Sequence, residues 1–323
     1  MIQSKNKPNT SKNAMRVIVV GLGVQGHKRR KFATSDFVAA VDPVHPEAKY
    51  RSLMDVPLTD FDAALVCTPD EPKLELLTYL LGNGKHVLVE KPLWAPEESQ
   101  LQNLEKLARD NGVFCYTAYN HRFEPHFVRM RDLVASGRLG RIHRCRMFYG
   151  NGTARLVRDS EWRDQGAGVL PDLGSHLLDT VRFWFGAPAD DFRVISASRF
   201  ENRAPDHVVI GSEGTQPKIE LEMTLLMWRN HFTCDILAEN GTAHIESLCK
   251  WGPSRFTVRT RILPSGRPPE ESVTLVQDDP TWALEYAYFR AACLDRRRTD
   301  LSTDLWLNRA LRGLGERAIE ASS

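Results

Sequence analysis

The sequence predicts two domains: a doubly wound parallel α/β domain of the Rossmann type, followed by a mainly antiparallel, open-sheet α+β domain. In the first part of the chain, short β-branched segments alternate with helix-like segments, the pattern of a parallel sheet covered on both faces. Further along, the apolar segments become longer and partly alternate with polar residues, as expected for an antiparallel sheet with one covered face. We place the domains at residues 15–120 and 121–323.

The composition is that of an ordinary globular protein. Its 43 basic and 41 acidic side chains give a net charge of +2, so no overall basic field favours nucleic acid. No apolar run approaches the roughly 18 residues of a membrane-spanning helix. Residues 1–14 are polar throughout and predict a disordered tail instead of a signal peptide. Six scattered cysteines without a CxxC pair favour a reduced, cytoplasmic protein without a metal site.

The first predicted strand, 16–20, runs directly into a GxGxxG turn that is followed by a helix-like segment, 27–34. In this context the glycines allow a tight turn and let a dinucleotide pyrophosphate approach the helix N-terminus. We expect the cofactor to contact the whole turn: Gly21, Gly23, Val24, Gln25 and Gly26.

The second predicted strand, 37–41, ends at Asp42. A carboxylate about 20 residues past the first glycine can accept a hydrogen bond from the adenine-ribose 2′-hydroxyl. The same charge would repel a 2′-phosphate, so the sequence favours NAD over NADP. A plain aspartate at the end of a strand is the alternative.

Three further strands are predicted at 63–67, 86–90 and 113–119, and the helices between them end at Gly82 and near Arg109. Ligands bind such sheets at the carboxyl ends of the strands. We therefore expect the residues at these ends to meet cofactor or substrate: Thr68, Pro69, Glu90 and Lys91. For Lys91, a solvated loop lysine is the alternative.

In the second domain we predict helices at 127–135, 281–290 and 303–321, and a surface loop at 263–271. The hairpin sequence Glu239-Asn240-Gly241 joins two of the predicted strands. These strands cover residues 144–149, 192–198, 207–211, 219–228, 232–237 and 242–247. Helices would cover one face of the sheet and leave the other free to pair with another subunit, in a homodimer or homotetramer.

Two polar groups stand out in the second domain. Asp172 and His176 are four residues apart, and on a helix this spacing puts a carboxylate and an imidazole on one face, where the imidazole could take a proton. A helix-start carboxylate with a packed ring is the alternative. The loop between Gly150 and Gly168 could clamp a phosphate or carboxylate, or its arginines could simply be solvated; it carries Arg155, Arg158, Trp162 and Arg163.

Together these motifs resemble the glucose–fructose oxidoreductase / inositol dehydrogenase (Gfo/Idh/MocA) family. The resemblance rests on the glycine turn, on Glu90-Lys91-Pro92, on YNxRFxP at 119–125 and on GxGxxxDxGxHxxD at 166–179. It implies a tightly held nicotinamide cofactor and hydride transfer on sugars, polyols or sugar derivatives. It also implies that Lys91 contacts substrate and nicotinamide ribose, that His176 removes the hydroxyl proton, and that Asp172 binds substrate or tunes the other two. We add Asn120 and Arg122 to the substrate-binding candidates.

The chain departs from the family pattern in two places. Residues 43–64 are too few for the helix and further strand expected there, and Lys73 stands where a histidine is common. The leading hypothesis is an NAD(P)-dependent sugar or sugar-derivative dehydrogenase, with sugar nucleotides among the candidate substrates. The alternatives are a glycosidase-type enzyme that uses bound NAD transiently and a non-catalytic dinucleotide-binding regulator.

Overall fold

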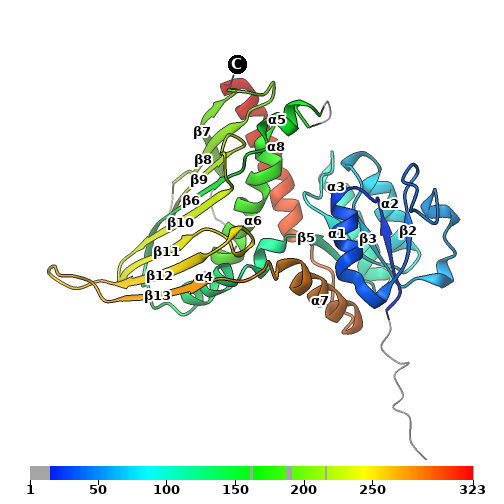
Figure 1. The fold of residues 1–323 in the computed structure, drawn as a ribbon, viewed down its shortest axis with the longest axis horizontal. Helices are drawn as coiled ribbons and strands as arrows, with labels where there is room; N and C mark the ends of the chain where they lie inside the picture. The colour runs from blue at the N-terminus through cyan, green and yellow to red at the C-terminus, as the bar shows by residue number, and fades with distance from the viewer. Residues whose placement is uncertain (1–14, 161–162, 187–190, 215–216, 323) are drawn as a thin grey trace, which may run out of the picture. The chain divides into compact units, whose positions relative to one another are not determined.

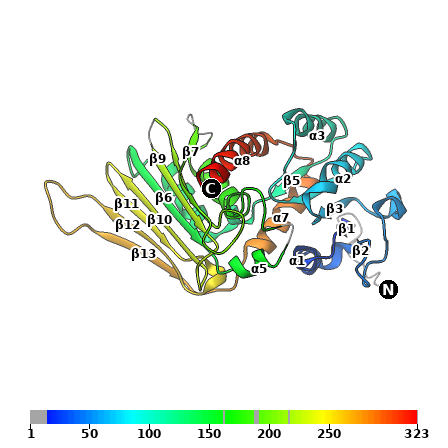
Figure 2. The same cartoon turned by 90° about the horizontal axis from the view of Figure 1, so that it is seen from above.

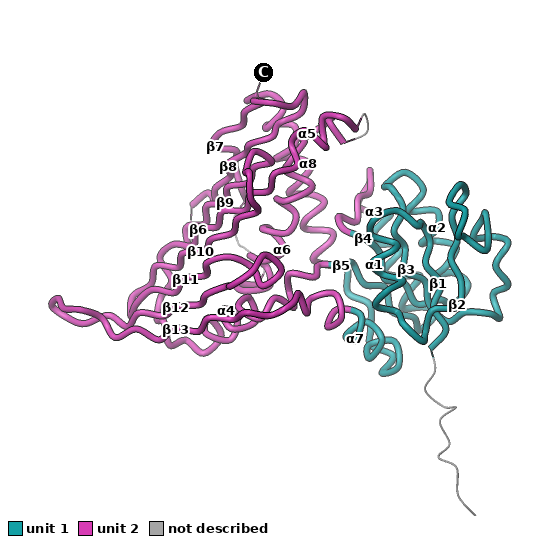
Figure 3. Tube along the Cα trace, viewed as in Figure 1, with its two compact units in different colours: residues 1–90, 99–118, 286–301 teal, residues 91–98, 119–285, 302–323 magenta. Residues whose placement is uncertain are grey.

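A computed structural model describes residues 15–160, 163–186, 191–214 and 217–322, which form two compact units (Figure 3). Unit 1 contains the chain up to Glu90 with Ser99–Ala118 and Tyr286–Leu301, and unit 2 contains Lys91–Glu98, Tyr119–Glu285 and the chain from Ser302 onward. The sequence divided the chain only once, after residue 120. A single domain boundary does not account for residues 286–301, which belong to unit 1 although they follow most of unit 2 in the chain. Within unit 1, the Thr299 hydroxyl donates to the Val113 carbonyl. The predicted tail, 1–14, lies outside the described residues.

Unit 1 is built on a five-stranded parallel sheet in the order β2-β1-β3-β4-β5. The strands are β1 (Val17–Val20), β2 (Phe37–Val41), β3 (Ala63–Val66), β4 (His86–Glu90) and β5 (Cys115–Ala118). Every residue of β1, β3 and β5 is buried, as expected for strands covered on both faces. The predicted Rossmann-type sheet is confirmed.

Three helices of unit 1 lie between these strands in the chain: α1 (Val24–Ala33), α2 (Asp70–Gly82) and α3 (Glu98–Asp110). The part of α7 (Thr281–Leu294) from Tyr286 onward returns to unit 1 after the strands of unit 2. Helix α1 begins at Val24, three residues earlier than predicted, so it starts inside the glycine turn. Between β2 and β3 the short connection forms two 3₁₀ turns, Leu53–Asp55 and Leu58–Asp60, in place of a helix.

Unit 2 is built on an eight-stranded sheet in the order β13-β12-β11-β10-β6-β9-β8-β7 (Figure 1). Its neighbouring strands are antiparallel except for β6 and β9, which are parallel. The strands are β6 (Ile142–Gly150), β7 (Phe192–Ser198), β8 (His207–Ser212), β9 (Lys218–Thr224), β10 (His231–Ala238), β11 (Gly241–Glu246), β12 (Ser254–Thr260) and β13 (Glu270–Leu275).

Helices pack against one face of this sheet, and α8 can be followed along it in Figure 2. They are α4 (Pro125–Ala135), α6 (Ser175–Phe185) and α8 (Ser302–Ala321); α6 is preceded by a π-turn (Leu170–Gly174), and a short helix, α5 (Ala154–Arg158), follows β6. Alternate residues of β10, Phe232, Cys234 and Ile236, are buried in the core that these helices share with the sheet.

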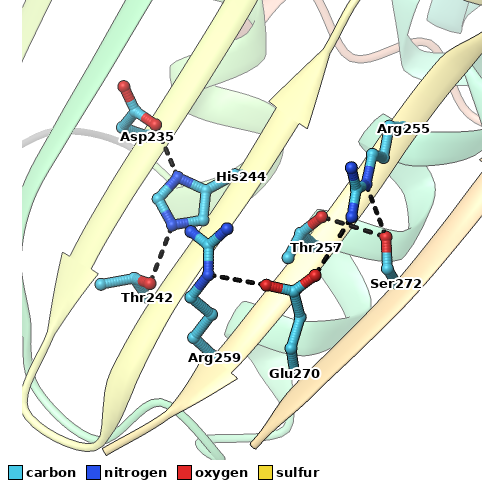
Figure 4. Close-up of polar contacts among 8 residues, drawn as sticks. All are labelled: Asp235, Thr242, His244, Arg255, Thr257, Arg259, Glu270 and Ser272. Atoms are coloured by element: carbon cyan, nitrogen blue, oxygen red, sulfur yellow. Dashed lines mark hydrogen bonds and ion pairs between the residues drawn. The ribbon is translucent and has the colours of Figure 1, made fainter. Parts of the chain in front are cut away.

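The other face of the sheet is polar and its charges are paired across strands (Figure 4). His244 bonds Asp235 at 2.6 Å, and Glu270 accepts from Arg255 at 3.1 Å and from Arg259 at 2.9 Å. Opposite charges placed across neighbouring strands stabilise a sheet without apolar cover.

Three sequence expectations for unit 2 are corrected. Strand β9 ends at Thr224, not Trp228, because the chain turns into the connection to β10. Strands β12 and β13 were not anticipated, and Glu270 and Glu271 belong to β13 instead of the predicted loop. Four of the six β13 residues are exposed, so this edge strand lacks the apolar pattern by which strands are recognised. Within the described ranges, no helix has the length and hydropathy to cross a membrane.

Candidate active site

The glycine turn of unit 1 has the geometry of a dinucleotide-binding turn. Gly21 has a φ of +91°, and a Cβ on it would lie 2.9 Å from the Cys67 carbonyl oxygen; a Cβ on Gly26 would lie 1.9 Å from the Gly21 oxygen. Gly23 differs, since a Cβ there would meet nothing within 4 Å. Two glycines are thus required by the fold, whereas Gly23 keeps a space open beside the first amides of α1, which suits a pyrophosphate.

Asp42 stabilises the conformation of this turn through hydrogen bonds to backbone amides. Its carboxylate accepts hydrogen bonds from the backbone amides of Leu22 at 2.8 Å, Val44 at 3.0 Å and His45 at 2.8 Å. Partial burial raises the pKa of Asp42, but these amides outweigh it and leave the pKa below its ordinary value. The group is therefore a carboxylate anion at neutral pH.

Three more residues expected at the cofactor, Thr68, Pro69 and Glu90, lie at or just past the ends of β3 and β4. The Thr68 hydroxyl oxygen is buried and has no hydrogen-bond partner among the described residues, and a ligand hydroxyl or phosphate would satisfy it. Pro69 precedes the first residue of α2. Glu90 instead pairs with Arg29 of α1 at 2.7 Å, and both side chains are largely buried, so Glu90 ties β4 to α1. Lys73 lies nearby on α2, buried, with its ammonium 2.6 Å from Asp70.

In unit 2, the ammonium of Lys91 binds Asp172. Its Nζ donates to Asp172 Oδ1 at 3.0 Å and to the Asp172 carbonyl at 2.8 Å, and Arg163 Nη2 lies 3.8 Å from the other carboxylate oxygen. Burial would raise the pKa of Asp172, but the charge and hydrogen bond of Lys91 outweigh it and lower the pKa. Two cations thus hold one carboxylate on the π-turn.

His176, in the first turn of α6, is 8% exposed and stacks on His121 of the 3₁₀ turn Asn120–Phe123, with ring centroids 4.0 Å apart. Its Nδ1 is buried without a hydrogen-bond partner among the described residues. Burial holds the pKa of His176 well below its ordinary value, and the neighbouring His121 and Lys91 lower it further. The imidazole is therefore neutral at physiological pH and able to accept a proton.

The segment from Asp172 onward is helical, as predicted, although its first turn is a π-turn. The two groups that the spacing singled out have separate partners: Asp172 contacts Lys91, and His176 contacts His121. No hydrogen bond joins Asp172 to His176 within the described chain.

Lys250 lies beside the stacked rings of His121 and His176, and the sequence did not point to it. It lies in the 3₁₀ turn Cys249–Trp251, with its Nζ 3.3 Å from His121 Nε2, 3.4 Å from the Tyr149 hydroxyl and 4.7 Å from the centroid of the Trp251 ring. Burial lowers its pKa below the ordinary value for lysine. No motif surrounds Lys250, and it reaches His121 from 129 residues away, so no local signal could have found it.

The remaining predicted substrate residues have other partners. Asn120 donates to the Thr281 hydroxyl at 2.8 Å, and Arg122 makes a bidentate ion pair with buried Asp179, at 2.5 and 2.9 Å, that ties its segment to α6. Arg155 and Arg158 are exposed on α5, where Arg158 donates to a backbone carbonyl at 3.4 Å. Of the arginine-rich loop, only Arg163 reaches the Lys91–Asp172 pair among the described residues. Trp162 lies outside the described residues.

This cluster combines a proton acceptor with two lysines. A neutral imidazole beside an ammonium can take a hydroxyl proton while the ammonium stabilises the charge that develops on oxygen. Among the described residues, no group of three or more histidine, cysteine or acidic side chains could hold a metal ion.

The chain matches two domain models of one protein family. Residues 11–119 match the model of the oxidoreductase family with an NAD-binding Rossmann fold, and residues 127–244 match the GFO/IDH/MocA C-terminal domain. Together the two models reach into both predicted domains.

Among curated proteins, the chain is similar to uncharacterized oxidoreductase C26H5.09c of Schizosaccharomyces pombe, at 32% identity over 44% of this chain and 39% of that protein. It is also similar to scyllo-inositol 2-dehydrogenase (NADP(+)) IolW of Bacillus subtilis, at 30% identity over 39% of this chain and 36% of that one. The chain thus spans about two-fifths of the length of these relatives. A solved structure of levoglucosan dehydrogenase in complex with NADH has the same fold, with a TM-score of 0.80 and 17% identity over 95% of this chain and 98% of that one.

Proposed function

Because the chain belongs to the Gfo/Idh/MocA family, we propose that it is an NAD(P)-dependent oxidoreductase acting on a hydroxyl-bearing carbon of a sugar, polyol or sugar derivative. The observation that carries the proposal is the neutral, buried His176 in one cluster with the Lys91–Asp172 pair. The names of the relatives, which include an inositol dehydrogenase and levoglucosan dehydrogenase, support the class of substrate.

The residues of this chain have separate tasks in that reaction. When bound, the nicotinamide cofactor accepts or returns a hydride. The turn Gly21–Gly26 would hold its pyrophosphate, and the Thr68 hydroxyl is a further donor. His176 accepts the proton of the substrate hydroxyl, and Lys91 stabilises the charge that develops on that oxygen. Asp172 orients the Lys91 ammonium through the 3.0 Å contact.

We also propose that NAD is preferred over NADP. The ionised carboxylate of Asp42 follows β2 and would accept from a ribose 2′-hydroxyl but repel a 2′-phosphate. The ratio of kcat/KM for NAD to that for NADP tests this, with Asp42→Asn as the variant that removes the charge and keeps an acceptor oxygen. The ratio should fall at least tenfold in Asp42→Asn. A wild-type protein that prefers NADP would contradict the assignment.

The test of the activity is reduction of added NAD or NADP by a panel of sugars, polyols and sugar nucleotides, followed through absorbance of the reduced nicotinamide. Sustained turnover should be lost in the double variant Lys91→Ala/His176→Ala. Turnover that survives in this variant would contradict the assigned chemistry. Glycoside cleavage without accumulation of reduced cofactor would instead indicate transient redox chemistry.

Finally, we propose a homodimer or homotetramer formed through the polar face of the unit 2 sheet. Two exposed aliphatic side chains of this sheet, Ile195 at 51% and Leu237 at 43%, support burial against a second copy. The charge pairs drawn in Figure 4 are compatible with it, because paired charges cost less to bury than single ones. Light scattering after size-exclusion chromatography should give a dimeric or tetrameric mass that decreases in Leu237→Glu. A monomeric mass at all concentrations would contradict this assembly.

A further inference from the structure

An open pocket of about 510 Å³ lies in unit 2, and its lining does not include Lys91, Asp172 or His176. It is lined by residues 226–231, which connect β9 to β10, and by Ser247, Trp251 and Pro253. Its size is within the range of about 300–1,000 Å³ that is typical of small-molecule sites.

The β9–β10 connection is held firmly in place. The Met227 amide donates to the Asn151 carbonyl at 3.0 Å, and a Cβ on Gly152 would lie 2.2 Å from the Met227 carbonyl oxygen. Arg229 Nη2 donates to the Trp251 carbonyl at 3.3 Å, which links the β9–β10 connection to the 3₁₀ turn Cys249–Trp251. The pocket is therefore preformed, and its shape depends on the absence of a side chain at residue 152.

The lining combines aromatic faces with hydrogen-bonding edges. Trp228 is fully exposed although its indole is large and apolar, and Trp251, from another segment of the lining, is half-buried. Polar side chains stand beside them: Arg229, Asn230, His231 and Ser247. A pyranose ring has the complementary chemistry, because its C–H bonds form an apolar face that packs on an aromatic ring while its hydroxyls project from the edge.

Trp251 joins the pocket to the catalytic cluster. The Lys250 ammonium lies 4.7 Å from the Trp251 ring centroid and 3.3 Å from His121 Nε2, and His121 stacks on His176. Tyr149 lies against the same indole, with ring centroids 5.7 Å apart. A ligand in the pocket would therefore share a wall with the site at which the hydroxyl is oxidised.

We propose that this pocket is a second sugar subsite, which binds a pyranose ring glycosidically joined to the ring that is oxidised. The substrate is then a disaccharide or a larger glycoside, not a free monosaccharide. This inference rests on the proposed oxidoreductase function and deepens it by naming the size of the substrate.

The kinetic test compares disaccharides with the methyl glycosides of the same oxidised sugar, which lack the second ring. The ratio of kcat/KM for disaccharide to that for methyl glycoside should exceed ten in the wild type. Loss of one stacking contact is worth about three- to tenfold, so the ratio should fall by this factor in Trp228→Ala. Phe200→Ala is the matched control, because Phe200 is an aromatic side chain of the same unit, 68% exposed and outside the pocket lining. It should leave the ratio unchanged.

The binding test is titration calorimetry of the disaccharide into the Lys91→Ala/His176→Ala protein loaded with oxidised cofactor, with and without Trp228→Ala. Weaker binding of the disaccharide in the presence of Trp228→Ala supports the subsite, even where the wild-type protein shows no turnover. The absence of turnover counts only against the proposed activity. Turnover with equal ratios in the wild type and in Trp228→Ala overturns the subsite and leaves the activity standing. Trp228-dependent binding of a sugar nucleotide but not of a disaccharide assigns the pocket to a nucleobase and overturns the pyranose assignment.

Discussion

Replacing Lys91 by methionine is predicted to lower kcat for sugar oxidation by about 10²–10³-fold. The ammonium donates to Asp172 at 2.8 and 3.0 Å, and methionine removes this charge while keeping an unbranched side chain. A positioned donor at a developing oxyanion contributes about 2.7–4 kcal/mol to transition-state stabilisation. KM for the cofactor should change much less, since the glycine turn and Asp42 are intact.

The same substitution should leave the fold intact. Lys91 is 15% exposed and Asp172 39% exposed, so after the substitution the Asp172 carboxylate still meets water and still has Arg163 at 3.8 Å, and we expect a cost of about 1 kcal/mol. That corresponds to a fall in Tm of at most about 4 °C. A large loss of activity with a small shift in Tm therefore separates a catalytic role from a structural one.

The pH profile provides a second readout. The positive charge of Lys91 lowers the pKa of His176, so its removal raises that pKa and moves the acid limb of the kcat/KM profile to higher pH. Lys106→Met is the matched control, since Lys106 forms an exposed ion pair with Asp110 on α3. A Lys91→Met protein that retains more than a third of wild-type kcat would show that the Lys91 ammonium does not stabilise the transition state.

Three further predictions concern the glycine turn, Lys250 and the buried histidines. Gly26→Ala should lower both Tm and cofactor affinity, because its Cβ would lie 1.9 Å from a carbonyl oxygen. Gly23→Ala should weaken only cofactor binding, measured by calorimetry, because its Cβ would meet nothing within 4 Å. Equal losses of Tm in the two variants would contradict this difference. Lys250→Met should raise the pKa of His176 and move the acid limb of the pH–rate profile to higher pH, whereas Lys250→Arg keeps the charge and should leave the limb in place. Identical pH–rate profiles for the two variants would contradict a role for the Lys250 charge. Because burial depresses the folded-state pKa of His121 and His176, the unfolded chain binds more protons below pH about 6.5. Stability should then decline from that pH downward by up to about 1.4 kcal/mol per pH unit for each histidine, as measured by urea unfolding, and a decline unchanged in His121→Asn would contradict this assignment.

The parallel sheet could be predicted because its central strands are continuous apolar runs. Ala63–Val66 is buried throughout, and a short apolar run next to glycine- or proline-containing turns is typical of a strand covered on both faces. The edge of the large sheet could not be predicted in this way. Strand β13 alternates little and is mostly exposed, and its pairing with β12 depends on contacts such as Arg255–Glu270 that become visible only in three dimensions.

The sequence pointed to candidate residues only where they lie in short motifs. Asp172 and His176 were proposed from their spacing and Lys91 from its place after a strand, and the structure gives Asp172 a contact with Lys91 and His176 a contact with His121. His121 stood at a variable position between two predicted substrate ligands, and nothing in its neighbourhood indicated that it stacks on His176. Arg122 resembled a substrate ligand, but its guanidinium is bound to Asp179. Contacts between distant segments decide these roles, and residue types alone do not.

In the function proposed above, the cluster around His176 oxidises a sugar hydroxyl, and the carbinol hydride passes to nicotinamide. Mass spectrometry of the cofactor after incubation with sugars deuterated at their carbinol carbons tests this most directly. We predict reduced cofactor carrying one deuterium with the wild-type protein and none with Lys91→Ala/His176→Ala. Unlabelled cofactor with every sugar of the panel, or equal labelling by the double variant, would contradict the claim.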